Sequence, residues 1–263
     1  MSASALAAIK PQHPLISTAR NPAQSTAAND DYDPIEVSSL VPIALTEIQR
    51  FRDYLRTIPF RYPDTSPTIL GRELTIEGDV RAFFDSSILL VVWPVILAMV
   101  PTIRNEDLRL AWESPLPGAV KHRPDVTVYL CGAGYETPIT HIEYKAPECL
   151  SSFQEVVSQQ VPEEDVSTSS DTSEEDLNPA WIKITKQLTK YSMNGSSNIL
   201  CSDGSDAYIF IFPDNDESTD VLWVRASDDG SAVLTLRESL LFLLFFAINS
   251  GPHLNLRYVL VTF

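Results

Sequence analysis

The stretches RPDVTVYL (residues 123–130) and HIEYK (residues 141–145) decide the fold of this chain. The first is a β-branched run that opens on Asp125, and the second contains Glu143 and Lys145. Seventeen residues separate Asp125 from Glu143, which suits two adjacent strands joined by a hairpin and would place the two carboxylates side by side. Glu143 and Lys145 are two residues apart, so on a strand both side chains project from one face.

Two carboxylates in this arrangement suit a hard cation such as Mg²⁺, which prefers oxygen ligands. An ammonium group beside them can meet the negative charge that develops on a phosphate. The pattern resembles the signature of the PD-(D/E)XK nuclease superfamily. Pro124-Asp125 matches the first half of that signature, and Glu143-Tyr144-Lys145 matches the second half.

A predicted helix adds to the resemblance. Residues 181–191 (WIKITKQLTKY) have helical character, and Gln187 and Tyr191 share one helix face at a spacing of four residues. This matches the Gln-x-x-x-Tyr element that follows the Glu-x-Lys strand in recombination-type exonucleases of the superfamily. Residues 199–204 and 207–212 look like the next hairpin of the core sheet. The resemblance spans residues 73–212, most of the part of the chain expected to be ordered, and the chain is similar to the nuclease-like domains of many fungal proteins.

The resemblance implies Mg²⁺-dependent hydrolysis of phosphodiester bonds in nucleic acid, DNA rather than RNA, with Mn²⁺ as the other usable cation. It assigns the metal to Asp125 and Glu143, with the carbonyl of Tyr144 as a further ligand. A carboxylate from the first core helix often joins the metal site in this family. Glu77 is the residue expected in that role, ahead of Asp79.

The resemblance also assigns catalytic roles. Lys145 would orient the attacking water or stabilise charge in the transition state. Gln187 and Tyr191 would position the substrate backbone or support the metal site. Glu113 would replace Glu77 if the first core helix lay elsewhere.

Each of these residues also has an ordinary structural interpretation. Asp125 can cap a turn at the start of its strand. Glu143 and Lys145 can form a solvated pair on an exposed sheet face, because the residues that alternate with them are not strongly apolar. Tyr191 can lie in the core with Gln187 near the surface.

Three further residues near the motif have structural interpretations. Glu77 can favour the positive end of a helix dipole. His122 and His141 are expected at loop or hairpin ends rather than at ligand positions.

Length and composition indicate one sizeable domain with tails in the 263 residues. The three cysteines show no Cys-x-x-Cys spacing, which argues against a disulfide framework or a zinc site and fits a reducing intracellular compartment, nucleus or cytoplasm. The N-terminus lacks the basic start and apolar stretch of a secretory signal. The apolar runs 88–100 and 240–248 fall short of the roughly 20 residues that span a bilayer, so no membrane association is expected.

The net charge of −16 opposes a nucleic-acid partner, because affinity for a polyphosphate comes from Lys and Arg. Residues 151–179 hold eight acidic residues and no Lys or Arg, so half of the net charge lies in one segment. This segment could recruit a basic protein partner. Basic residues lie near the motif instead: Lys121, His122, Arg123 and Lys145, with Lys183, Lys186 and Lys190 on the Gln187 helix.

The remaining pattern predicts the organisation of the chain. Residues 1–40 are expected to be a disordered tail, and the acidic residues 158–178 a disordered insertion. Helices are predicted at 46–58, 77–100 and 236–249, the second kinked or divided at Pro94. Strands are predicted at 107–113, 221–225 and 256–263, in addition to those of the motif.

We therefore predict an α/β fold for residues 41–263: a mixed central sheet of about four core strands flanked by helices, in the PD-(D/E)XK arrangement. Two other classes of function stay open. One is a catalytically inactive nuclease-fold protein that acts as an interaction module. The other is an unrelated α/β binding domain in which the motif is a coincidence.

Overall fold

The computed structural model describes residues 3–9, 32–60, 74–100, 107–113, 123–132, 135–150, 153, 179–213 and 220–250. The predicted acidic insertion 158–178, the predicted strand 256–263 and His122 lie outside these residues.

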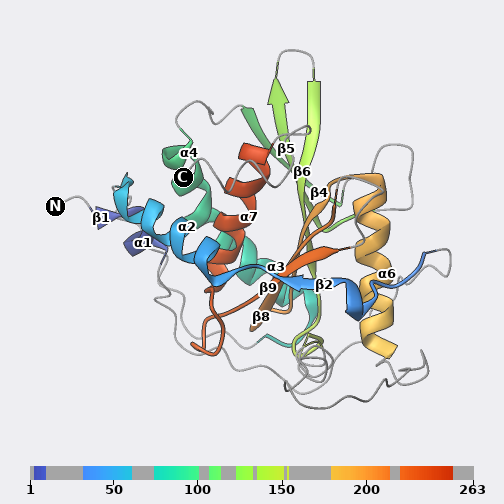
Figure 1. The fold of residues 1–263 in the computed structure, drawn as a ribbon. Helices are drawn as coiled ribbons and strands as arrows, with labels where there is room; N and C mark the ends of the chain where they lie inside the picture. The colour runs from blue at the N-terminus through green and yellow to red at the C-terminus, as the bar shows by residue number, and fades with distance from the viewer. Residues whose placement is uncertain are drawn as a thin grey trace.

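One mixed sheet of seven strands organises the fold, in the order β2-β9-β8-β7-β6-β5-β4 (Figure 1). Neighbouring strands are antiparallel except for the pairs β2–β9 and β6–β7. The α/β prediction with a mixed sheet against helices is confirmed, and the sheet is larger than the four core strands expected. The strands are β2 (Leu40–Pro42), β4 (Leu108–Trp112), β5 (Val126–Gly132), β6 (Tyr135–Tyr144), β7 (Asn198–Ser202), β8 (Asp206–Ile211) and β9 (Val221–Ser227).

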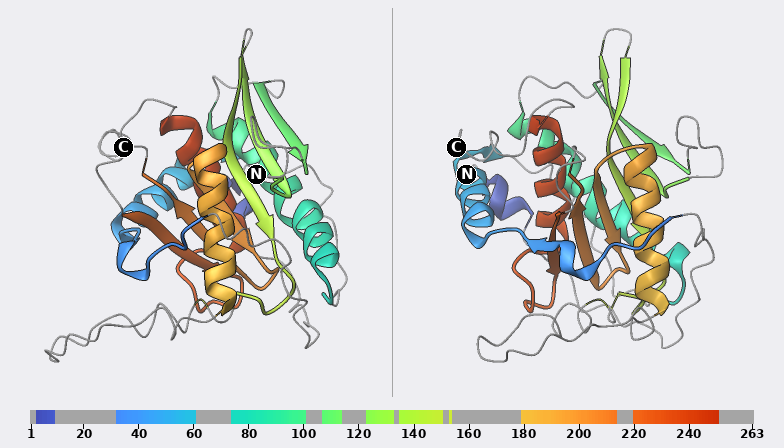
Figure 2. Two further views of the ribbon diagram at one scale, coloured as in Figure 1. Left: turned by 90° about the vertical axis from the view of Figure 1, so that its right-hand side faces the viewer. Right: turned by 45° about the vertical axis from the view of Figure 1, so that its right-hand side comes forward.

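Helices cover both faces of this sheet (Figure 2). Helix α6 (Pro179–Asn194) lies on one face, where it packs on alternate residues of β7 such as Ile199 and Cys201. The opposite face carries α3 (Glu77–Phe84), α4 (Leu90–Met99) and α7 (Leu236–Ser250), which pack on Ile142 and Tyr144 of β6 and on Leu200 of β7. Helix α2 (Leu45–Thr57) packs outside α7 through Phe51, whose ring meets that of Phe242 at 5.2 Å. Burial on both faces is the reason that the central strands contain few exposed residues.

The predicted helix over 77–100 is interrupted before Pro94 rather than at it. A π-helical turn, η2 (Asp85–Leu89), joins α3 to α4, and Pro94 lies inside α4. The whole segment Glu77–Met99 is long and apolar enough to cross a membrane by length and composition, but 56% of its most apolar window is buried inside the fold. Burial against the sheet and α7 identifies it as a core helix.

The N-terminal residues correct one prediction. Residues 1–40 were expected to be disordered, yet β1 (Ala3–Ser4) pairs with β3 (Pro59–Phe60) and α1 (Ala5–Ala8) follows at once. The Ala5 amide donates to the Ile58 carbonyl at 3.0 Å, and Ala5 and Ile9 are fully buried. Residues 32–40 are also structured, and Ile35 lies in the core beside α6. The apolar run of 5–9 is too short to show a helical period, so its burial could not be predicted.

The N-terminal helix should therefore contribute to stability. We predict that Ile9→Ala lowers the free energy of unfolding by about 2–5 kcal/mol, the usual cost of truncating a buried Ile. The measurement is denaturant unfolding, with Ala7→Ser at an exposed position of the same helix as the control. An Ile9→Ala protein that unfolds at the wild-type midpoint would show that this segment does not pack on the domain.

Candidate active site

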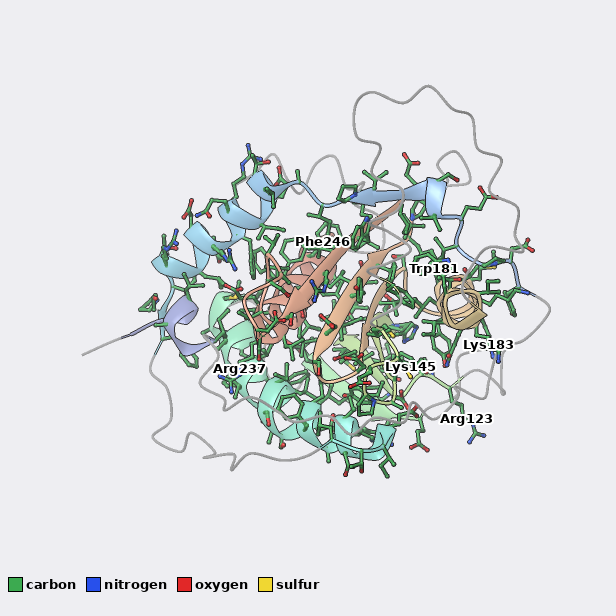
Figure 3. The ribbon with its side chains drawn as sticks, turned by 90° about the horizontal axis from the view of Figure 1, so that it is seen from below. Arg123, Lys145, Trp181, Lys183, Arg237 and Phe246 are labelled. Atoms are coloured by element: carbon green, nitrogen blue, oxygen red, sulfur yellow. The ribbon has the colours of Figure 1, made fainter. Side chains whose placement is uncertain are left out.

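A buried triangle of polar side chains joins β6 to α6. The ammonium of Lys145 lies 2.5 Å from Oε1 of Glu143 and donates to Oε1 of Gln187 at 2.9 Å. The Gln187 amide nitrogen donates to the same Glu143 oxygen at 2.5 Å. The side chains of Glu143 and Lys145 are only 6% and 3% exposed. The alternative of a solvated surface pair is therefore wrong. Figure 3 shows Lys145 inside the fold, on the side of the sheet that faces α6.

Both sheet faces around the pair are covered, which explains its burial. Ile142 and Tyr144 alternate with Glu143 and Lys145 along the chain and are fully buried in the opposite core. The prediction that these alternating residues are too weakly apolar to form a core face is therefore wrong. Burial is the largest single influence and lowers the pKa of Lys145, but the charges of Glu143, Cys201 and Glu77 and the hydrogen bond to Glu143 together raise this pKa.

Tyr191 extends the triangle along α6, as the four-residue spacing predicts. The Gln187 amide nitrogen donates to the Tyr191 hydroxyl at 2.8 Å, and that hydroxyl donates to the carbonyl of Arg123 at 3.3 Å. Gln187 is 5% exposed and Tyr191 is 3% exposed. The interpretation of Gln187 as a near-surface residue is therefore wrong. Burial, aided by the charge of Glu143, raises the pKa of Tyr191 and keeps its hydroxyl protonated.

Asp125 lies beside this triangle at the start of β5. The pairing of Val126 with Ile142, continued by one residue, sets Asp125 opposite Glu143, so the two side chains share a sheet face. The amide of Tyr144 donates to Oδ2 of Asp125 at 2.7 Å. Burial, and next the negative charge of Glu143, raise the pKa of Asp125 to about 7.

Glu77 approaches the same site from the N-terminus of α3. Burial raises its pKa, Lys145 lowers it and Glu143 raises it again, which places Glu77 within electrostatic reach of both. Asp79, the second choice, instead accepts hydrogen bonds from the amides of Thr75 and Ile76 and caps the helix.

Glu113, the other substitute for Glu77, does not belong to the site. Its side chain is 61% exposed and forms an ion pair with Arg81. Asp125, Glu143 and Glu77 therefore influence one another electrostatically, whereas Asp79 and Glu113 are engaged with other partners.

His141 differs from its prediction at a hairpin end. It lies within β6 and is fully buried, where Nε2 accepts from the Ser196 amide at 2.9 Å and Nδ1 lies 3.0 Å from the Thr127 hydroxyl. Burial lowers the pKa of His141 to about 3, so the ring is neutral. Its role is to hold the end of α6 to the sheet.

Asp203 is not predicted from the sequence as a site residue, yet it orders the turn that follows Lys145. Its carboxylate accepts from the Leu150 amide at 3.0 Å and from the Ser205 and Asp206 amides. Burial raises the pKa of Asp203 to about 6. The residues Asp203-Gly204-Ser205 have the composition of a turn, but the partner at Leu150 is 53 residues away in sequence, so the contact carries no local signal.

The donor set fits a divalent cation. Three carboxyl groups lie within electrostatic range of one ammonium, and Oε2 of Glu143 is buried with no hydrogen-bond partner among the described residues. A buried acceptor without a donor is costly unless a ligand satisfies it, and hard oxygen ligands suit Mg²⁺. Within the described part of the chain, no group of three or more His, Cys, Asp or Glu side chains is already arranged around a metal position. Asp125 and Glu143, with Glu77, are the residues that could close on one.

Comparisons with protein-family models, curated proteins and solved structures gave no match to this chain.

The raised pKa of Asp125 gives a test of the site without substrate. The folded protein holds the proton of Asp125 up to about pH 7, whereas the unfolded chain holds it only to about pH 4. Asp125 therefore adds to the free energy of unfolding fully below pH 4, and this contribution is lost as the pH rises through 7. We predict that the metal-free protein melts at a lower temperature at pH 8 than at pH 5. The melting temperature of Asp125→Asn should fall less between pH 5 and pH 8.

Glu113→Gln, which removes an exposed carboxylate, serves as the control. The pKa of Asp203 is also raised, so the melting temperature of Asp125→Asn should still fall somewhat with rising pH. Equal pH dependence in the wild type and Asp125→Asn would contradict the placement of Asp125.

Proposed function

We propose that this protein is a metal-dependent nuclease of the PD-(D/E)XK type, which hydrolyses phosphodiester bonds of nucleic acid, DNA rather than RNA. One observation carries the proposal. One oxygen of the buried Glu143 carboxylate accepts from Lys145 and Gln187, and the other has no partner among the described residues, while Asp125 and Glu77 lie within electrostatic range of this carboxylate. A buried carboxylate oxygen without a donor is costly unless a ligand satisfies it.

Asp125 and Glu143, joined by Glu77, would hold Mg²⁺ or Mn²⁺. The cation, when bound, lowers the pKa of a water and polarises the phosphate. The Tyr144 amide fixes the direction of the Asp125 carboxylate through its 2.7 Å hydrogen bond. Gln187 holds Glu143 in place from the helix side, which leaves the unpartnered oxygen free for a ligand.

Lys145 would supply positive charge where negative charge develops on the phosphate. Two acceptors, Glu143 and Gln187, fix its ammonium, so its orientation needs no rearrangement during the reaction. Its raised pKa keeps it protonated and suits electrostatic stabilisation rather than proton abstraction. Tyr191 holds Gln187 from the next turn of α6 and ties it to the backbone at Arg123.

The chain as a whole is acidic, but basic side chains around the site would contact the substrate backbone. Arg123 and Lys183 point outward next to α6 (Figure 3). Lys190 lies close enough to Glu143 that this carboxylate raises its pKa against the larger lowering by burial. The free thiols of Cys131, Cys149 and Cys201 suit an intracellular protein, in the nucleus or the cytoplasm.

The acidic composition favours a second candidate function, an inactive nuclease-fold module that binds a basic protein. Residues 151–179 hold eight acidic residues and no Lys or Arg, in a chain of net charge −16. Such a module would need no metal, so metal binding and cleavage separate the two candidates.

We predict that Asp125→Asn and Lys145→Ala each abolish Mg²⁺-dependent cleavage for different reasons. Asp125→Asn removes a charge that holds the cation, so its Mg²⁺ affinity should fall. Lys145→Ala should keep metal binding and lose transition-state stabilisation, with a comparable donor worth about 2.7–4 kcal/mol. Calorimetric Mg²⁺ titration beside a cleavage assay on DNA and RNA, single- and double-stranded, distinguishes the two effects.

Glu136→Gln, at an exposed position of β6 far from the site along the strand, is the matched carboxylate control and should cleave like the wild type. Lys145→Arg keeps the positive charge, and thermal melting of each variant checks that a loss of cleavage does not reflect misfolding. Full cleavage by Asp125→Asn and Lys145→Ala, or a wild type inert on every substrate, would overturn the nuclease proposal.

A further inference from the structure

A short turn, Asp203-Gly204-Ser205, joins β7 to β8 beside the candidate active site. The amide of Lys145 donates to the carbonyl of Ser202 at 2.9 Å, which continues the parallel pairing of β6 with β7 by one residue. Asp203 is therefore the neighbour of Lys145 on the next strand, about 4.8 Å away, and both side chains lie on the sheet face that α6 covers. The register of the sheet thus places this β7–β8 turn next to the site.

The carboxylate of Asp203 is engaged through both of its oxygens. Oδ1 accepts from the amides of Ser205 and Asp206 at 3.1 and 2.9 Å, and Oδ2 accepts from the amide of Leu150 at 3.0 Å. Asp203 is only 1% exposed, so water has little access to replace these donors. Charge-assisted bonds of this kind join the β7–β8 turn to the chain segment that follows Lys145.

The segment that Asp203 holds begins directly after Lys145 and contains a strained residue. Glu148 has a φ of 66°, a left-handed conformation that a residue other than glycine keeps only when surrounding contacts enforce it. The amide of Leu150, two residues further on, makes such a contact through its bond to Asp203. Without that bond the turn would relax, and Lys145 at its start would shift within the buried triangle.

Gly204 connects the same turn to the helix that carries Glu77. Its φ is 90°, and a Cβ atom at this position would lie only 2.5 Å from Cδ1 of Leu74 and 3.5 Å from Cγ2 of Val80. Leu74 and Val80 are fully buried, three residues before and three residues after Glu77. Asp79 ties the first turn of α3 to the residues before it, so a displacement of Leu74 also displaces Glu77. Only glycine fits both this backbone conformation and this space.

We propose that the β7–β8 turn positions two functional groups of the site relative to each other. Asp203 holds the chain that starts at Lys145, and Gly204 sets the start of α3, which carries Glu77. The inference rests on the proposed nuclease function, in which Glu77 joins the metal ligands and Lys145 stabilises the transition state. Asp203 and Gly204 are positioning residues, because each acts through another side chain. Small displacements of reacting groups cost much rate, so each substitution should impair the group that it releases.

Asp203→Asn tests the link to Lys145. An Asn side chain has one acceptor oxygen, so it cannot keep the bonds at both ends of the carboxylate, although its volume is nearly the same. We expect kcat with Mg²⁺ to fall about 10- to 100-fold, while the Kd for Mg²⁺ stays within about threefold of the wild type. The Nζ resonance of Lys145, which is 2% exposed, should shift and exchange faster with water in ¹⁵N-lysine-labelled Asp203→Asn.

Asp228→Asn is the matched control for Asp203→Asn. Asp228 accepts from the amide of Leu236 at 2.9 Å, at the start of α7 on the opposite face of the sheet. Its substitution therefore removes a similar bond without touching the segment after Lys145, and it should leave kcat and the Lys145 resonance unchanged. Each protein is assayed below its melting temperature and at pH 8, above the pKa of about 6 of Asp203.

Gly204→Ala tests the link to Glu77. We expect the Kd for Mg²⁺ to rise about 10- to 100-fold, the usual cost of disturbing a residue that orients a metal ligand. Gly230→Ala is the matched control, because Gly230 has a φ of 83° and no atom of the described residues within 4 Å of an added Cβ. It carries the same backbone strain without the contact. In a Glu77→Gln protein, Gly204→Ala should weaken Mg²⁺ binding no further, because the ligand that it displaces is already lost.

Three results would overturn the proposal. The first is a wild-type kcat with an unchanged Lys145 resonance in Asp203→Asn, or an equal loss in Asp228→Asn. The second is equal Mg²⁺ affinity in Gly204→Ala and Gly230→Ala. The third is a full additional loss of Mg²⁺ affinity when Gly204→Ala is added to Glu77→Gln.

The two proposals fail separately. A wild type that binds Mg²⁺ but cleaves no nucleic acid would refute the nuclease function, and the Lys145 resonance and the Mg²⁺ titrations would still decide the role of the turn. A wild type that cleaves, with kcat unaltered in Asp203→Asn, would refute the role of the turn and leave the nuclease function standing.

Discussion

The buried ion pair between Glu143 and Lys145 is the interaction on which the rest of this site depends. Two charges removed from water are stable only when their remaining hydrogen-bonding capacity is met. Gln187 meets part of that need by contacting both side chains, and this contact fixes α6 on the sheet. One oxygen of Glu143 stays unpartnered among the described residues, and burial followed by the charge of Glu143 raises the pKa of the neighbouring Asp125. Stability alone does not require that unpartnered oxygen, whereas binding of a cation does.

The sequence predicts which residues share a face better than it predicts their burial. Alternation in HIEYK correctly places Glu143 and Lys145 together, and the four-residue spacing correctly places Gln187 beside Tyr191. Burial of the pair depends on α6, which covers it from more than 30 residues further along the chain. The same alternation suggested a solvated pair, because Ile142 and Tyr144 do not look like a core face until α3 and α7 are seen to cover them.

Features that depend on contacts distant in sequence could not be predicted. Asp85 looks like an interruption of an apolar helix, and its contacts with Tyr144 and Trp112 appear only once the π-helical turn lies against the sheet. His141 is a polar residue inside a central strand, satisfied by Ser196 and Thr127. Residues 3–9 pack on the domain because Ile58 and α2 receive them, which their own composition does not reveal.

The central claim is that Glu143 and Asp125 share one divalent cation. Anomalous diffraction from crystals soaked in Mn²⁺, a cation that takes the same oxygen ligands as Mg²⁺, tests it most directly. The account predicts one strong peak at ordinary metal–oxygen distance, roughly 2.0–2.2 Å, from Oε2 of Glu143 and from an oxygen of Asp125, with Lys145 still bound to Oε1. Crystals with no peak at this position, or with Mn²⁺ bound only elsewhere on the acidic surface, would contradict it.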